Sequence, residues 1–181
     1  MWGLAYALLV AALVLRFRQP DDAPAAPLRP LPGEPLWLTR LHHALFALVL
    51  VAAPLERLTA GGAGRWRVAG VALFAVGVAL YRIAGRTLGD ALSPFIEPRE
   101  GVPLVTHGPY RHLRHPIYLA EGMIALGAPL ALGCRLVLGV SVAAVAVLAF
   151  RIGREEEALA RTFPEYVRYA SRTKRVLPFV Y

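Results

Sequence analysis

Cysteine is almost absent from this chain of 181 residues, since Cys134 is the only one. A single cysteine excludes an intrachain disulfide and a cysteine-rich metal cluster. It stands between Gly133 and Arg135, where a small residue in a tight turn is expected. Acidic residues are also few, with 12 Asp and Glu against 20 Lys and Arg. Because the basic residues flank apolar runs and form no separate polar domain, nucleic-acid binding is not expected.

Apolar residues are abundant instead, at 57% of the chain, and the mean hydropathy is +0.51. Both values exceed what the core of a soluble domain requires. A membrane span needs about 20 predominantly apolar residues. The sequence therefore predicts an all-α integral membrane protein with about five transmembrane helices, at 1–15, 36–58, 68–84, 116–132 and 136–150.

The first of these segments has no preceding basic region and no small-residue cleavage site, so it resembles a short membrane helix more than a removed signal peptide. Residues 16–35 contain six prolines and form a polar connector. We divide the chain into an N-terminal two-span region, 1–64, and a second membrane domain, 65–181.

Only Gly133-Cys134-Arg135 separates the last two apolar segments, so they should form an antiparallel hairpin. The residues before Pro116 and after Phe150 are thereby brought to one membrane face. If the N-terminus lies outside, sixteen Lys and Arg residues fall on the cytoplasmic side and four outside. This positive-inside asymmetry favours a site that faces the cytoplasm.

A dense polar segment, 107–118, precedes the hairpin and is the first candidate site. Its Arg and His residues meet the start of an apolar helix, where exposed backbone N–H groups suit an anionic or polar ligand. The alternative is a basic anchor beside lipid headgroups. The preceding loop, 86–114, contains four prolines and several apolar residues, which favour a packed lid.

Some polar residues lie within the apolar segments. His42 and His43 are expected to be interfacial or packed and not metal ligands, because no acidic or cysteine partner has matching spacing nearby. Glu121 is either a site residue or a solvated interfacial glutamate. Gly70 and Gly77 share a helical face and would permit close helix packing.

Arg151 and Glu155 are four residues apart and share a helical face after the hairpin. They form either a functional pair or an ordinary solvated ion pair. Beyond them, the aromatic and basic residues of 163–175 suggest an amphipathic helix that lies against the membrane.

Four elements in this order resemble the isoprenylcysteine carboxyl methyltransferase family, which is related to membrane phospholipid N-methyltransferases. They are Leu104-Val105-Thr106-His107-Gly108-Pro109-Tyr110, Arg114-His115-Pro116-Ile117-Tyr118, Arg151 with Glu155-Glu156, and Phe163…Tyr166…Tyr169 followed by Leu177-Pro178. The resemblance covers roughly residues 65–181.

The resemblance implies a cytoplasmic pocket for S-adenosylmethionine between the loop and the helix that follows the hairpin. Its cofactor-binding residues would be Leu104, Val105, His107, Tyr110, Arg114, His115, Pro116, Ile117, Tyr118, Glu155 and Glu156. Arg151 would be catalytic and face the methyl acceptor. The implied partners are membrane lipids and a lipophilic or prenylated acceptor, methylated on oxygen or nitrogen, in a protein of the bacterial inner membrane; the oligomeric state stays open.

Two other functions remain possible at this point. A membrane reductase would use a nicotinamide cofactor in a similar loop, although no G-x-G-x-x-G pattern occurs. A non-catalytic membrane scaffold is the other, because Val102 stands where the resembled family often has a histidine. For methyl transfer to an amine, the residues that offer a base are His107, His112 and Glu121.

Overall fold

A computed structural model describes residues 35–60, 65–99 and 101–177. In these ranges the chain is helical, with connecting segments and an isolated β-bridge. The long helices are α2 (Leu36–Ala60), α3 (Arg67–Leu88), α4 (Pro116–Leu132) and α5 (Arg135–Thr162). Shorter helices are η2 (Gly89–Ala91), η3 (Gly108–Arg111) and α6 (Tyr166–Ala170). The expected first span at 1–15 and most of the proline-rich connector lie outside the described residues.

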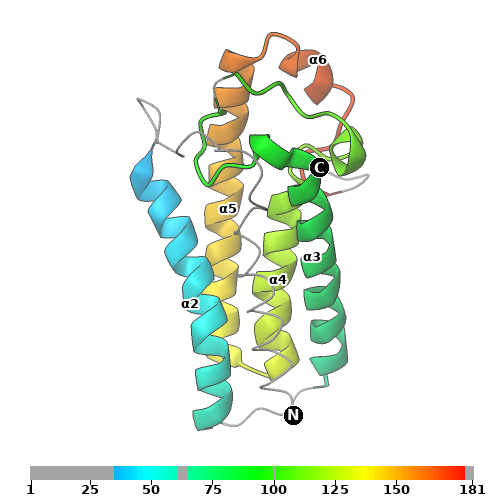
Figure 1. Ribbon diagram of the computed structural model, residues 1–181. Helices are drawn as coiled ribbons and strands as arrows, with labels where there is room; N and C mark the ends of the chain where they lie inside the picture. Colours follow the sequence, from blue (N-terminus) through cyan, green and yellow to red (C-terminus); the bar gives the residue numbers. More distant parts are fainter. Residues whose placement is uncertain (1–34, 61–64, 100, 178–181) are drawn as a thin grey trace.

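The four long helices stand roughly side by side, and the short helices gather at one end of the bundle (Figure 1). By length and composition, α2, α3 and α5 could each cross a membrane, and α4 is a shorter apolar helix. The all-helical membrane architecture is thus confirmed. The last helix is longer than the apolar span predicted at 136–150, because α5 continues through the charged segment to Thr162.

The hairpin of α4 and α5 is confirmed. Gly133 ends α4 with φ of 75°, a left-handed conformation that favours glycine. Cys134 is buried in the turn, and its thiol contacts the Ala53 carbonyl oxygen of α2 at 3.1 Å. Glu56 of α2 accepts the backbone N–H groups of residues 135–137, so α2 also caps the first turn of α5. The start of α4 and the end of α5 therefore meet at the opposite end of the bundle.

Glycines allow the backbones of α3 and α4 to touch. A Cβ at Gly70 would lie 2.3 Å from the Ala131 nitrogen, and one at Gly127 would lie 2.6 Å from the Phe74 nitrogen. A Cβ at Gly77 would lie 2.9 Å from the Cβ of Met123. The predicted close packing through Gly70 and Gly77 is confirmed. Helix association in membranes relies on such close contact, because burial away from lipid supplies little driving force.

The connection between α3 and α4 packs onto the bundle, as expected for a lid. Ile96 is buried with Leu38 of α2 and Ala158 of α5. The C-terminal segment also folds back, through a parallel bridge between Leu113 and Lys174. The expected C-terminal amphipathic helix is short, since α6 has five residues and the chain after it bends toward the start of α4.

We predict that Gly127→Ala lowers the melting temperature of the detergent-purified protein markedly, because the new methyl group overlaps the backbone of α3. Gly139→Ala on α5 is the matched control, since a Cβ there meets nothing within 4 Å. The control should leave the melting temperature unchanged or raise it, as alanine favours helix by about 1 kcal/mol. Equal melting temperatures for the two variants would contradict the glycine-mediated contact.

Candidate active site

Arg151 of α5 is the centre of a polar cluster at the end of the bundle where α4 begins. Its side chain is buried, at 2% exposure. Its Nε donates to the Tyr118 hydroxyl at 2.8 Å, its Nη1 to the Thr39 hydroxyl at 3.1 Å, and its Nη2 to the Pro94 carbonyl at 2.5 Å. These acceptors belong to α4, α2 and the loop before α4. One guanidinium thus joins three other parts of the fold to α5.

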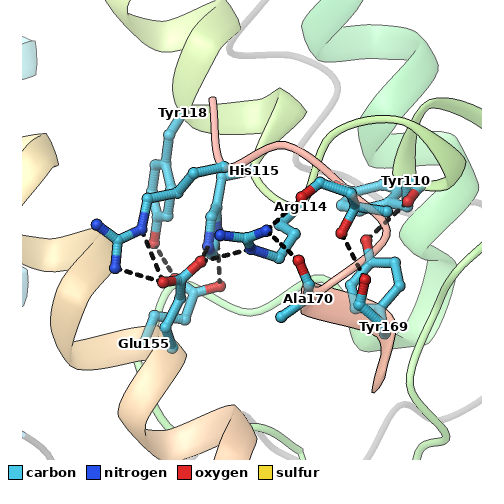
Figure 2. Close-up of polar contacts among 10 residues, drawn as sticks. Tyr110, Arg114, His115, Tyr118, Glu155, Tyr169 and Ala170 are labelled. Atoms are coloured by element: carbon cyan, nitrogen blue, oxygen red, sulfur yellow. Dashed lines mark hydrogen bonds and ion pairs between the residues drawn. The ribbon is translucent and has the colours of Figure 1, made fainter. Parts of the chain in front are cut away.

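Tyr118 connects Arg151 to Glu155. Its hydroxyl accepts from the guanidinium and donates to Glu155 Oε2. The two residues that share a face of α5 therefore meet through the tyrosine. The Tyr118 ring also stacks on His115 at 5.7 Å between centroids, and His115 Nδ1 lies 3.8 Å from Glu155 Oε1. Figure 2 shows Tyr118 and His115 side by side, with their polar ends toward Glu155.

Glu156, the next residue, contacts a different set of groups. Its Oε1 accepts from Arg114 Nε at 2.7 Å and lies 3.2 Å from His115 Nε2. Its Oε2 accepts from Arg175 Nε at 2.7 Å. Arg114 also donates to the carbonyl oxygens of residues 170 and 173, at 2.8 and 2.5 Å. Glu156 therefore fastens the C-terminal segment to the start of α4.

Two tyrosines extend the cluster toward α6. The Tyr169 hydroxyl donates to the Tyr110 carbonyl oxygen at 2.7 Å, and both residues lie beyond the end of Arg114 in Figure 2. Burial raises the pKa of Tyr169 to about 12, and burial together with the charge of Glu155 raises that of Tyr110. Both phenols therefore remain neutral at physiological pH. The buried Tyr110 hydroxyl has no hydrogen-bond partner among the described residues.

The structure brings seven of the residues singled out in the sequence into one cluster. These are Tyr110, Arg114, His115, Tyr118, Arg151, Glu155 and Glu156. Pro116 is buried at the first position of α4. Leu104, Val105 and Ile117 are partly buried. His107 is exposed, and its carbonyl oxygen accepts the Tyr110 backbone N–H at the start of η3. Glu121 and His42 are both buried, with Nε2 of His42 and Oε2 of Glu121 3.5 Å apart. Glu121 is therefore not a solvated glutamate, and His42 is packed, which is one of the two placements expected for it.

Sequence reasoning missed four members of this site: Thr39, His42, Pro94 and Arg175. Thr39 and His42 lie on α2, more than 70 residues before their partners Glu121 and Arg151. Pro94 contributes a backbone oxygen, which no side-chain pattern reveals. A three-residue spacing between Thr39 and His42 on an apolar helix was the available signal, because it places two polar side chains on one face.

Parts of this chain are similar to known proteins. A model of the phospholipid methyltransferase family matches residues 66–166, which is more than half of the chain. The nickel-cobalt-cadmium resistance protein NccN of Alcaligenes xylosoxydans xylosoxydans is 29% identical over 151 residues, 78% of this chain and 67% of that protein. The cobalt-zinc-cadmium resistance protein CzcN of Cupriavidus metallidurans is 37% identical over 92 residues, 46% of this chain and 39% of that protein.

A solved structure shares the fold. It is the eukaryotic intramembrane Ras methyltransferase ICMT, an isoprenylcysteine carboxyl methyltransferase, with a TM-score of 0.58 and 22% sequence identity. The match covers 83% of this chain and 55% of that protein. The region matched by the family model begins after α2, so Thr39 and His42 lie outside it.

We predict that Glu156→Gln loosens the C-terminal segment, because the neutral amide loses charge-assisted hydrogen bonds to two arginines. The free energy of unfolding should fall by about 1.5–3 kcal/mol, and amide hydrogen exchange of residues 170–175 should accelerate. Glu157→Gln is the control, since that carboxylate is 57% exposed and pairs with Arg154 at the surface. If both variants exchange alike, Glu156 does not fasten this segment.

Proposed function

Because the chain belongs to the phospholipid methyltransferase family, we propose that it is an S-adenosylmethionine-dependent methyltransferase that acts on a lipophilic acceptor from the bilayer. The family and the apolar helices make it an integral membrane protein of a methyltransferase family. The proposal includes the identity of the cofactor, the identity of the methyl acceptor and the roles of the site residues.

The observation that carries the proposal is the position of Glu155 beside two aromatic rings. S-adenosylmethionine has an ammonium, a carboxylate and a sulfonium, and these need an acid, hydrogen-bond donors and aromatic faces. Glu155 offers the acid, and its side chain is 24% exposed, compared with 14% for Glu156. His115 and Tyr118 offer stacked rings, and the unpartnered Tyr110 hydroxyl offers a buried polar group. The donor set therefore fits the cofactor.

Glu155 and Glu156 have separate roles in this proposal. Glu156 already forms ion pairs with Arg114 and Arg175, so it holds the loop and the C-terminal segment in place. Glu155 would bind the ammonium of the cofactor. Leu104, Val105 and Ile117 would contribute apolar surface. His107, which is exposed, would lie at the rim of the site.

When bound, S-adenosylmethionine supplies a methyl group that is already activated by the sulfonium. The protein then needs to align the acceptor and exclude water, which supplies much of the rate acceleration in such a displacement. Arg151 is positioned to orient an acceptor head group, because its guanidinium is fixed by three hydrogen bonds from three directions. Ile96 and the loop around it would cover this region from the cytoplasmic side.

The charge distribution supports a cytoplasmic orientation in a bacterial inner membrane. Exposed basic side chains gather at the end of the bundle that carries the site, including Arg111, Arg168, Arg172 and Lys174. The positive-inside rule assigns such an end to the cytoplasm. The cofactor would then enter from water, and the acceptor would enter from the lipid.

We expect the protein in detergent to bind S-adenosylmethionine saturably, and Glu155→Gln to weaken that binding by about 1.5–3 kcal/mol, as for a charge-assisted hydrogen bond. Glu157→Gln, a surface carboxylate on the same turn, should leave the affinity unchanged. Isothermal titration calorimetry measures both. A parallel titration with NADPH tests the reductase: saturable binding of NADPH alone would overturn the proposal, and binding of neither would favour a scaffold.

Arg151→Lys keeps the positive charge but loses the planar fork that contacts Tyr118, Thr39 and Pro94. We expect cofactor affinity to stay within about threefold while methyl transfer to a bacterial lipid extract falls at least about tenfold. Labelled S-adenosylmethionine measures the transfer. Arg154→Lys on the exposed face of α5 is the control. If Arg151→Lys changes the melting temperature alone, Arg151 has a structural role only.

A further inference from the structure

A second polar layer lies one helical turn farther into the bundle than Arg151 and its partners. His42 follows Thr39 by three residues on α2, and Glu121 follows Tyr118 by three residues on α4. Residues three apart share a helical face, so this layer continues the faces that contact Arg151. His42 Nε2 and Glu121 Oε2 lie 3.5 Å apart in it.

This pair is buried, yet one oxygen of Glu121 lacks a hydrogen-bond partner among the described residues. The side chains of His42 and Glu121 are 5% and 12% exposed. Glu121 Oε2 accepts no hydrogen bond from the residues that the structure describes. Its distance to His42 also exceeds the usual length of an N–H···O bond, about 2.7–3.2 Å. A buried acceptor without a donor is costly, so this arrangement is suited to a ligand that brings a donor.

The charges around Glu121 favour such a ligand over an anion. The titratable and charged groups that interact with it come from all four long helices and from η3. They are His42 of α2, Tyr81 of α3, Tyr110 of η3, Tyr118 of α4, and Arg151 and Glu155 of α5. Glu121 and Glu155 thus both interact electrostatically with Arg151, which donates its hydrogen bonds to other groups. A carboxylate brought in by an acceptor would add a third carboxyl group and no donor, whereas a head group with an N–H or S–H would supply the missing donor.

We propose that His42 and Glu121 form the acceptor subsite and take up the proton that the methyl acceptor loses. The acceptor is accordingly a lipophilic molecule whose reacting nitrogen or sulfur carries a hydrogen. This inference rests on the proposed methyltransferase function and assigns it a substrate class and two further catalytic residues.

The acceptor atom forms a bond to the methyl carbon with its lone pair. The bond from that carbon to the sulfonium sulfur breaks, and its electron pair stays on sulfur. The hydrogen of the acceptor atom leaves as a proton to His42 Nε2 or Glu121 Oε2, so atoms and charge balance. Half of this pair is on α2, outside the region that the family model matches. The choice of acceptor therefore depends in part on a helix that lies outside the matched region of this chain.

The test uses the full-length protein in lipid vesicles with labelled S-adenosylmethionine and three acceptors: dodecylamine, dodecanethiol and N-acetyl-S-farnesylcysteine. We expect label on the amine or the thiol and none on the carboxylate. Glu121→Gln and His42→Gln should lower that transfer at least about 100-fold, the scale of general base catalysis, and remove the basic-side rise of the pH–rate profile. Cofactor affinity should be unchanged, which also shows that the variants fold. Transfer to the carboxylate only would overturn the subsite.

A second measurement tests acceptor binding and does not depend on methyl transfer. Adding dodecylamine to the cofactor-free protein should change the infrared carboxyl bands, and Glu121→Gln should abolish the change. Glu56→Gln is the matched control, because that carboxylate caps α5 at the opposite end of the bundle. It should lower the melting temperature and leave both the bands and the transfer intact. An infrared change that persists in Glu121→Gln, or full transfer in both subsite variants, refutes the assignment. Absence of cofactor binding by the unmodified protein would instead refute the methyltransferase itself.

Discussion

A guanidinium buried among apolar helices is tolerated only when acceptors surround it, and Arg151 imposes that requirement on its neighbours. Thr39, Tyr118 and Pro94 meet it from three different elements. Removing any of these acceptors would leave part of a charge unsatisfied in a medium of low polarity. One side chain therefore links how closely α2 approaches α5, how α4 is rotated about its axis, and how deeply the loop before α4 lies in the bundle.

The α4–α5 hairpin determines what this centre can do. Because the two helices turn back at Gly133, the start of α4 and the charged turn of α5 must lie at the same height. The stacked rings of His115 and Tyr118, near the start of α4, then lie beside Glu155 and Arg151, which are one turn apart on α5. In the proposed reaction this arrangement would place the cofactor beside Glu155 and the acceptor beside Arg151. Glycines of α3 keep its backbone against α4 and so support the same arrangement.

The sequence predicted the membrane class, the hairpin, the glycine contact and the meeting of the segment before α4 with the charged part of α5, because each depends on local patterns or on one short turn. It did not predict the contributions of α2. The partner of His42 is 79 positions away, and neither apolar periodicity nor charge spacing reports which faces of α2 and α4 meet. The carbonyl of Pro94 was equally hidden, because every residue has one. Glu121 stayed ambiguous since its depth depends on where the α2 helix packs.

Three consecutive glutamates show why position on a helix decides role. Successive residues of an α-helix differ by about 100° around its axis. Glu155 therefore faces Tyr118, Glu156 faces the arginines of the loop and C-terminal segment, and Glu157 faces solvent with Arg154. The chemistry of the side chain is identical in all three. The surrounding fold makes Glu155 a candidate ligand-binding group, Glu156 a clamp and Glu157 a surface residue, so adjacent acids in this chain can serve binding and structure separately.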